Sequence, residues 1–223
     1  MSNFDLIIFD CDGTLVDSEL LNNQATSEVL AEAGFLQYTT EYCLETFVGW
    51  SQRKIWDVVV RDHDRPLPDD INQRYIRRVA SLKDQLVRPA PGIADVLAAL
   101  SRQGPVCVAS NGEPENVRGL LEATDLLGFF EDHRIYTASQ VENPKPAPDL
   151  FLYAASQYGI APDRCLVVED SVAGATAGVV AGMTVFGYTG LTHDPDAHGG
   201  RLSALGVHKV SSQLSDLRTF AGV

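Results

Sequence analysis

The sequence lacks the features of disulfide-rich, membrane-spanning and nucleic-acid-binding proteins. It contains four cysteines and no C-x-x-C pair, which argues against a disulfide framework or a zinc site of that type. No apolar run reaches the ~18 residues that a transmembrane helix needs, and no basic n-region follows Met1. Lys and Arg total 17 against 30 Asp and Glu, and the first basic residue is Arg53.

This charge balance limits the partners. With a formal net charge of −13 at pH 7, the chain repels phosphate backbones and anionic lipid, so we expect neither nucleic acid nor a membrane surface as a partner. A small anionic substrate would need a local source of positive charge, such as a metal ion. We expect a cytoplasmic protein and take it to be a monomer.

Short apolar runs alternate with helix-like segments along the 223 residues, of which 45% are hydrophobic. Six runs have the length and apolar character of strands that are buried on both faces of a parallel sheet. They lie at residues 6–9, 105–109, 135–138, 165–168, 183–186 and, more weakly, 208–210. Amphipathic segments separate them. This alternation predicts an α/β fold with a doubly wound parallel sheet.

One long interval interrupts the alternation. Between residues 17 and 87 the patterns favour helices at 19–33, 40–47, 52–60 and 70–86. About seventy residues is more than a crossover connection needs. We therefore expect two domains, which are a Rossmann-like core of residues 1–16 and 88–223 and an inserted helical cap of residues 17–87.

Polar side chains follow three of the predicted strands at the point where each ends. They are Asp10 and Asp12 after the first strand, Ser110 and Asn111 after the second, and Glu169 and Asp170 after the fourth. Each alone has an ordinary explanation as a turn or helix-cap residue. Because the carboxyl ends of parallel strands meet at one edge of an open sheet, where such sheets bind ligands, we expect these residues to share one crevice.

Four carboxylates in one crevice need compensation. Two like charges ~4 Å apart repel by about 4 kcal/mol at an effective dielectric of roughly 20, so protons or a cation must reside among them. Oxygen ligands without clustered His or Cys favour Mg²⁺. The residues leave two chemistries open, which are paired metals with no covalent step and one metal with a carboxylate nucleophile.

A lysine and a helix start complete the predicted site. Lys145 lies between two prolines in the segment ENPKPAPD, and these prolines restrict the backbone. The loop can therefore present a fixed positive charge to a phosphoryl oxygen or to Asp10. Ser110 and Asn111 precede a predicted helix, whose free N–H groups favour anions. We expect phosphate binding by Ser110, Asn111 and Lys145.

These residues, in this order, resemble the four motifs of the haloacid dehalogenase superfamily. The matching positions are D-C-D-G-T at 10–14, Ser110, Lys145, and Glu169 with Asp170. The segment VVEDSVAGATAGVVAGM at 167–183 is typical of the β-phosphoglucomutase-like branch, and the helical insertion is similar to that branch's cap. The resemblance covers nearly the whole chain and implies a Rossmann-like core with an inserted α-helical cap.

The resemblance implies a Mg²⁺-dependent phosphatase that acts through an aspartyl-phosphate. Asp10 would be the nucleophile, and Asp12 would protonate the leaving alcohol and then activate water. Asp10, the backbone carbonyl of Asp12 and Asp170 would hold Mg²⁺, with Glu169 as a direct or water-mediated ligand. This favours one metal with a covalent nucleophile. The phosphoryl oxygens would be bound by Ser110 and Lys145.

Two alternatives to this function remain. A phosphosugar mutase of the β-phosphoglucomutase type usually has a histidine in the first cap helix, whereas D-S-E-L-L-N places Asn22 there, and an amide does not transfer protons at neutral pH. A non-catalytic binding module on the same fold would not need both Asp10 and Asp12. We therefore expect hydrolysis of a small phosphorylated metabolite.

Substrate contacts are predicted in the helical insertion. The stretch FVGWSQRK at 47–54 resembles the specificity loop of the branch. Arg53 or Lys54 can contact an anionic group, Trp50 can cover a sugar face, and Glu19 lies near the expected hinge. These contacts suit a sugar phosphate or a phosphorylated sugar acid. Alternatively, Arg53 and Lys54 begin a solvated helix and Trp50 packs inside the cap.

A further polar segment lies near the end of the chain. H-D-P-D-A-H-G-G at 193–200 contains His193 and His198, two of the five histidines. Their spacing makes no metal motif. We expect a flexible surface turn there.

Overall fold

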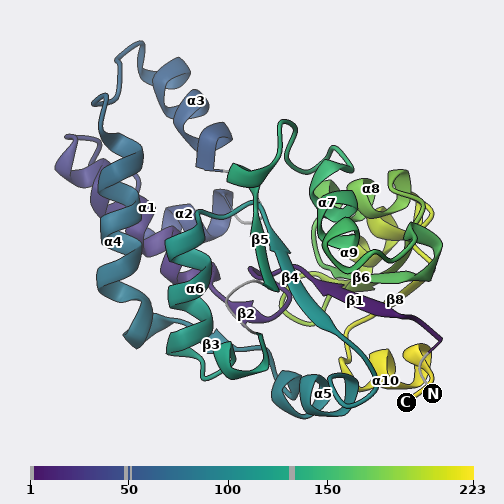
Figure 1. The fold of residues 1–223 in the computed structure, drawn as a ribbon. Coiled ribbons are helices and arrows are strands. Elements are labelled where there is room, and N and C mark those ends of the chain that lie inside the picture. The colour runs from purple at the N-terminus through teal and green to yellow at the C-terminus, as the bar shows by residue number, and fades with distance from the viewer. Residues whose placement is uncertain (1–2, 48–49, 51, 131–133) are drawn as a thin grey trace. The chain divides into compact units, whose positions relative to one another are not determined.

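The computed structural model describes residues 3–47, 50, 52–130 and 134–223. Their main feature is a six-stranded sheet of order β5-β4-β1-β6-β7-β8 (Figure 1). The strands are β1 (Leu6–Phe9), β4 (Val106–Ser110), β5 (Ile135–Thr137), β6 (Cys165–Glu169), β7 (Thr184–Tyr188) and β8 (Lys209–Ser211). Every neighbouring pair is parallel. The predicted α/β fold is confirmed, and the strand bounds lie within two residues of those predicted.

Helices cover both faces of this sheet (Figure 1). They are α5 (Ile93–Leu100), α6 (Pro114–Ala123), α7 (Asp149–Tyr158), α8 (Val172–Val180), α9 (Pro195–Ser203) and α10 (Ser215–Ala221). Alternate strand residues such as Ile8 and Val167 pack with α7 and α8 in one buried cluster. On the other face Phe186 contacts Phe220 of α10. Burial of β1 between β4 and β6 explains its continuous apolar run, because both of its faces and both of its edges are covered.

The structure corrects the prediction of a flexible turn at 193–200. Residues Pro195–Ser203 form α9, and the Asp194 carboxylate accepts a hydrogen bond from the N–H of Ala197. Asp at the N-cap followed by Pro at the first helical position is a strong helix start. Gly199 is buried, and a Cβ there would lie 3.2 Å from Val210. Gly199 therefore serves close packing, and neither it nor the exposed Gly200 breaks the helix.

The described chain divides into two compact units, Met1–Asp17 with Arg88–Val223 and Ser18–Val87. The chain passes between them through two short antiparallel strands, β2 (Val16–Asp17) and β3 (Arg88–Pro89). The sequence does not predict these strands, because two residues leave no periodic pattern. Their pairing places the start and the end of the insertion side by side.

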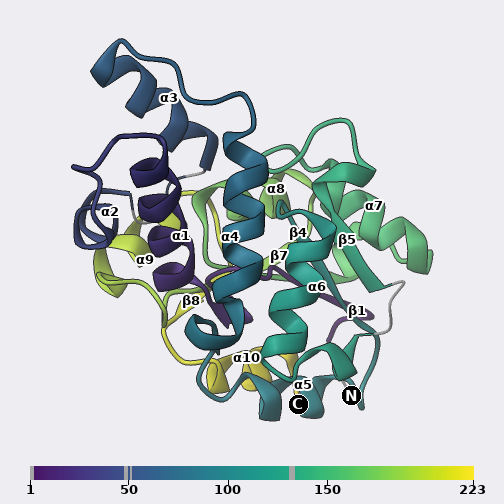
Figure 2. The same cartoon turned by 90° about the vertical axis from the view of Figure 1, so that its left-hand side faces the viewer.

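The second unit is helical. It contains α1 (Glu19–Glu32), α2 (Thr40–Thr46), α3 (Gln52–His63) and α4 (Ile71–Leu86), close to the bounds expected from sequence. Figure 2 shows α1 beside α4 within this unit. Val29, Phe35 and Trp56 belong to its own buried apolar cluster. Among the helices of the described residues, none has the length and apolar character needed to cross a membrane.

Candidate active site

The predicted strand ends meet at one edge of the sheet. Phe9 pairs with Val108 on one side and with Val168 on the other, so Asp10, Ser110 and Glu169 all emerge at the same edge. The backbone N–H of Asp10 donates to the Val168 carbonyl over 3.0 Å, which extends the pairing to the nucleophile candidate itself.

Lys145 connects two of the acids. Its Nζ donates to Asp10 Oδ1 over 2.7 Å and to Glu169 Oε1 over 2.8 Å. The exposed fraction of the side chain is 3% for Lys145, 11% for Asp10 and 1% for Glu169. Buried charges persist only when they are paired and hydrogen-bonded. The lysine therefore fixes both carboxylates and offsets their charge.

The loop that carries Lys145 is held by Asn111. The side-chain amide of Asn111 donates to the Lys145 carbonyl over 2.9 Å and accepts from the Lys145 N–H over 3.1 Å. The Lys145–Pro146 peptide bond is cis, and Nζ of Lys145 lies 4.7 Å from the Phe151 ring centroid. The sequence predicts phosphate binding for Asn111, and the structure shows its amide bound to the lysine loop.

Glu169 and Asp170 have partners of their own. Glu169 Oε2 accepts hydrogen bonds from the Ser171 N–H over 2.7 Å and from the Ser171 hydroxyl over 2.9 Å. Asp170 Oδ1 accepts from the Thr14 hydroxyl over 3.1 Å. Sequence reasoning missed the contribution of Thr14, because no spacing rule connects a hydroxyl to a carboxylate 156 residues away. It also missed that of Ser171, whose hydroxyl binds a carboxylate only two residues away.

Two glycines provide room for these carboxylates. A Cβ on Gly13 would lie 2.2 Å from Asp170 Oδ2, and the φ of Gly13 is +78°. A Cβ on Gly174 would lie 1.6 Å from Glu169 Oε1. Gly13 and Gly174 therefore make space for the acids of the site.

Burial and the neighbouring charges at this edge shift the pKa values of its acids. Burial, opposed by Lys145 and assisted by Glu169, raises the pKa of Asp10 to about 7. Burial and the charges of Glu169 and Asp10 raise the pKa of Asp170 well above its usual value. Burial alone would lower the pKa of Lys145, but Asp10 and Glu169 outweigh it and the pKa rises, so the lysine stays charged.

Carboxylate oxygens of Asp10, Glu169 and Asp170 lie within 4.8 Å of one another. Lys145 supplies one positive charge against these three acids, so two negative charges stay uncompensated when all three are ionised. A divalent cation with oxygen ligands would supply the missing charge. The donor set therefore fits Mg²⁺.

Comparison with known proteins identifies the family. The family model "Haloacid dehalogenase-like hydrolase" matches residues 7–188, which include every acid of the site. The chain belongs to the haloacid dehalogenase-like hydrolases. It is 32% identical to 6-phosphogluconate phosphatase of Escherichia coli K12 over 87% of this chain and 86% of the relative. It is 29% identical to the fructose-1-phosphate phosphatase of the same organism over 79% of this chain and 92% of that relative. On the strength of such relatives we describe it as a haloacid dehalogenase-like phosphatase.

A solved structure of the family shows the same fold. The crystal structure of a hydrolase of the haloacid dehalogenase family from Deinococcus radiodurans R1 has a TM-score of 0.77 and 33% identity to this chain. The match covers 99% of this chain and 96% of that one. That protein was crystallised with bound phosphate and sodium.

The phosphatase also brings Ser110 and Asp12 to this edge. Ser110 is 2% exposed, and its Oγ accepts a hydrogen bond from the Gly112 N–H over 3.0 Å. A Cβ built on Gly112 would lie 3.3 Å from Ser110 Oγ and 3.9 Å from Asp12 Oδ2. Both polar side chains therefore border the same short loop, as their sequence positions predict.

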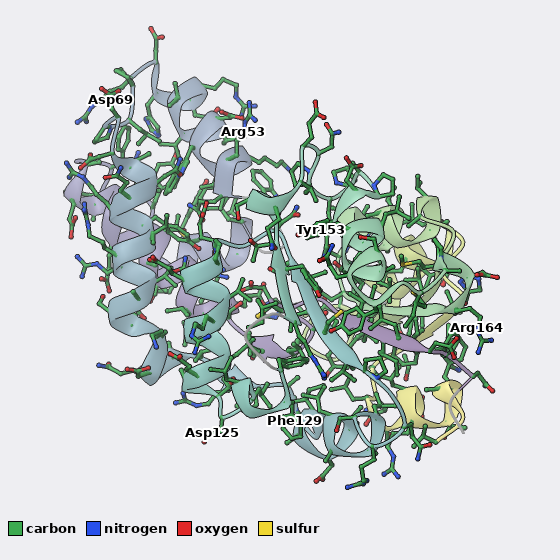
Figure 3. The ribbon with its side chains drawn as sticks, in the orientation of Figure 1. Arg53, Asp69, Asp125, Phe129, Tyr153 and Arg164 are labelled. Atoms are coloured by element: carbon green, nitrogen blue, oxygen red, sulfur yellow. The ribbon has the colours of Figure 1, made fainter. Side chains whose placement is uncertain are left out.

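The four remaining predicted residues of the phosphatase lie in its second unit. Arg53 is exposed near the start of α3 (Figure 3), and Glu19 begins α1. The Lys54 Nζ lies 3.6 Å from the Trp50 ring centroid, and Trp50 packs against the buried cluster of that unit. Val48, Gly49 and Ser51 of the predicted specificity loop are outside the described residues. The packing of Trp50 agrees with the alternative reading of this stretch, and its contact with a substrate stays a prediction.

Proposed function

We propose that this haloacid dehalogenase-like phosphatase hydrolyses a small sugar phosphate or phosphorylated sugar acid, with Mg²⁺, through a covalent phosphate on Asp10. The carrying observation is the buried group in which Lys145 holds Asp10 and Glu169 beside Asp170. A single fixed cation among three acids suits the transfer of an anionic group better than the stabilisation of a fold.

Asp10 is the proposed nucleophile. Its Oδ1 is held by Lys145, which fixes the direction of the carboxylate and favours its ionised form. An Asp10 oxygen attacks phosphorus while the bond to the leaving alcohol oxygen breaks and Asp12 gives that oxygen a proton. The Asp12 carboxylate then takes a proton from water, whose oxygen attacks the same phosphorus and releases phosphate and free Asp10.

The proposed Mg²⁺ ligands are Asp10, Asp170 and the Asp12 backbone carbonyl. Both oxygens of Glu169 already accept hydrogen bonds from Lys145 and Ser171, which supports a water-mediated contact for this residue. Thr14 orients the Asp170 carboxylate. When bound, Mg²⁺ would supply positive charge to the phosphoryl oxygens.

Ser110 and Lys145 are the proposed phosphate ligands. The Ser110 hydroxyl accepts the Gly112 N–H, and a hydroxyl that accepts one bond keeps its own proton to donate. Lys145 is charged, buried and adjacent to the nucleophile. The bound phosphate in the Deinococcus radiodurans relative supports an anion site in this fold.

The relatives support the substrate class, since two of them are phosphatases of 6-phosphogluconate and fructose 1-phosphate. The mutase alternative receives no support from Asn22, whose oxygen accepts the Tyr75 hydroxyl over 3.0 Å and whose amide nitrogen donates to Ser18 Oγ over 3.2 Å. An amide held in this way has no proton to exchange with a sugar hydroxyl.

A reducing compartment, such as the cytoplasm, is the proposed location. All four cysteines lie in the described ranges, and each is a buried free thiol. Burial raises the pKa of Cys43 and of Cys165 to about 11, so these thiols stay protonated at neutral pH. Thiols of this kind behave as small apolar side chains and not as redox groups.

Phosphate release from a panel of phosphorylated metabolites, with Mg²⁺ and with EDTA, tests the function. We expect free phosphate to be released when Mg²⁺ is present and not when EDTA is present. The turnover rate of Asp10→Asn should be at least about 10³-fold lower than that of the wild type. Asp5→Asn is the matched control, because Asp5 pairs with Arg164 at the exposed surface of the same unit. Equal turnover with EDTA, or an active Asp10→Asn variant, would refute the proposal.

A further inference from the structure

A histidine of α9 contacts the backbone of the proposed metal site. Nε2 of His198 is hydrogen-bonded to the carbonyl oxygen of Asp170. On its other side, Nδ1 of His198 is 3.0 Å from Nη2 of Arg201, one turn further along the helix. No family motif described above includes either residue, and the sequence pattern around them predicts a turn.

The partners determine which imidazole nitrogen carries the proton. A guanidinium can only donate, so Nδ1 of His198 accepts from Arg201. A carbonyl oxygen can only accept, so Nε2 must carry the hydrogen and donate it to Asp170. Both bonds are satisfied by the same neutral tautomer, and Arg201 thus orients the ring for its contact with the site.

The Asp170–Ser171 peptide unit is held from both sides. Its carbonyl accepts from His198, and its N–H, which belongs to Ser171, donates to Glu169 Oε2 over 2.7 Å. Rotation of this peptide would break both bonds at once. Because the same backbone carries the Asp170 carboxylate, whose Oδ1 is held by Thr14, the orientation of the peptide sets the direction of two acids in the cluster.

We propose that His198, oriented by Arg201, is a positioning residue that locks the Asp170–Ser171 peptide and so keeps Asp170 and Glu169 in the geometry that binds Mg²⁺. The proposal rests on the function proposed above. It assigns to α9 a role in metal affinity that is separate from substrate binding. Outer contacts of this kind typically change metal affinity by about 10- to 100-fold when removed.

A purely structural role for His198 would be the docking of α9 on the sheet. Docking of α9 and positioning of the Asp170–Ser171 peptide affect different measured quantities. Docking affects the stability of the whole unit and leaves the affinity of the folded protein for Mg²⁺ unchanged. Positioning affects the Mg²⁺ dissociation constant and leaves the KM for the phosphate ester nearly unchanged when Mg²⁺ is saturating.

The experiment measures Mg²⁺ binding by titration calorimetry at one pH, with no phosphate ester present, for the full-length wild type and four variants. His198→Ala removes the donor, His198→Gln restores an amide N–H at the position of Nε2, and Arg201→Ala removes the orienting partner. Ser203→Ala is the matched control, because its hydroxyl donates to the Gly199 carbonyl within the same helix. Thermal unfolding and KM at saturating Mg²⁺ are measured in parallel.

We expect the dissociation constant for Mg²⁺ to rise about tenfold in His198→Ala and about threefold in Arg201→Ala. His198→Gln should recover to within about threefold of wild type, and Ser203→Ala should not differ from it. An unchanged Mg²⁺ affinity in His198→Ala refutes the inference. If His198→Ala does not fold, either of two results refutes the inference. One is an unchanged Mg²⁺ affinity in Arg201→Ala, and the other is a Mg²⁺ affinity of His198→Gln that is tenfold or more below that of the wild type. A wild-type protein that binds no Mg²⁺ would instead refute the proposed function.

Discussion

Replacement of Lys145 by methionine should destabilise the protein far more than the loss of a surface charge. Methionine keeps much of the side-chain volume but leaves Asp10 and Glu169 without the cation that lies 2.7 and 2.8 Å from their oxygens. One carboxylate oxygen of Asp10 and one of Glu169 are no more than 4.8 Å apart, so the two ionised carboxylates would repel by about 3.5 kcal/mol at an effective dielectric of roughly 20. Removing one partner of a buried ion pair typically costs about 3–5 kcal/mol. We expect Lys145→Met to lower the free energy of unfolding by an amount in this range at pH 8 without metal.

A second substitution isolates the electrostatic part. Glu169→Gln alone removes a charge-assisted hydrogen bond and should cost about 1–2 kcal/mol. In the Lys145→Met background the same change removes the repulsion, so the double variant should be about 2 kcal/mol more stable than Lys145→Met. The penalty of Lys145→Met should also shrink as the pH falls towards about 7, the pKa of Asp10 with Lys145 in place. Without the lysine Asp10 takes up its proton above that pH, and a protonated carboxyl needs no cation.

Urea unfolding in EDTA, followed by circular dichroism and by hydrogen exchange of the β1 amides, measures these effects. Tryptophan emission would follow the wrong unit, because both tryptophans, Trp50 and Trp56, lie in Ser18–Val87. Arg118→Met is the control, since Arg118 pairs with the exposed Glu122 and should cost less than about 1 kcal/mol. If the effects of Lys145→Met and Glu169→Gln add to within about 0.5 kcal/mol, charge compensation does not explain the burial of Lys145.

Three further predictions concern the same site. Gly174→Ala places a Cβ 1.6 Å from Glu169 Oε1, so the acid must move, and we expect turnover to fall about 100-fold with a loss of about 2 kcal/mol in stability. Asn111→Ala removes both bonds to the Lys145 backbone and should lower kcat about tenfold. Because burial raises the pKa of Asp10 to about 7, the Mg²⁺ dissociation constant from calorimetry should increase as the pH falls below 7, up to about tenfold per pH unit.

Each of these predictions has its own control. Gly128→Ala should leave stability and turnover unchanged, since a Cβ at Gly128 has no neighbour within 4 Å among the described residues. Asn143, two residues before Lys145, makes an exposed hydrogen bond to Asp149 that Asn143→Ala removes. If Asn143→Ala lowered kcat as much as Asn111→Ala does, the role of Asn111 in positioning the lysine loop would be contradicted. A Mg²⁺ affinity that is constant between pH 5.5 and 8 would show that protons and metal do not compete for Asp10.

The sequence predicts the acids of the site because they directly follow buried strands. A run such as Leu6–Phe9 leaves a clear apolar pattern, and parallel strands with a common edge bring Asp10 and Glu169 together without further information. Lys145 is recognisable from its flanking prolines. These features are local in sequence, and the sheet topology converts them into a site.

The contacts that hold these acids in place cannot be read from the sequence in the same way. Thr14 meets Asp170 across 156 residues, and His198 reaches the same residue from a segment for which the sequence predicts a surface turn and the structure shows a helix. Such contacts depend on where helices dock on the sheet, and that docking is decided by packing between distant apolar faces. The predicted substrate contacts belong to the helical unit, where amphipathic patterns define helices but not ligands.

The pairing of β2 with β3 gives the insertion an evolutionary consequence. Asp17 lies opposite Arg88, so the polypeptide departs from the core and rejoins it at adjacent backbone positions. A segment anchored in this way can be lengthened, shortened or exchanged at small entropic cost, about 0.6 kcal/mol for each doubling of a loop. The helical unit, which carries the predicted substrate contacts, can therefore diverge while the strand-end acids of the core stay unchanged.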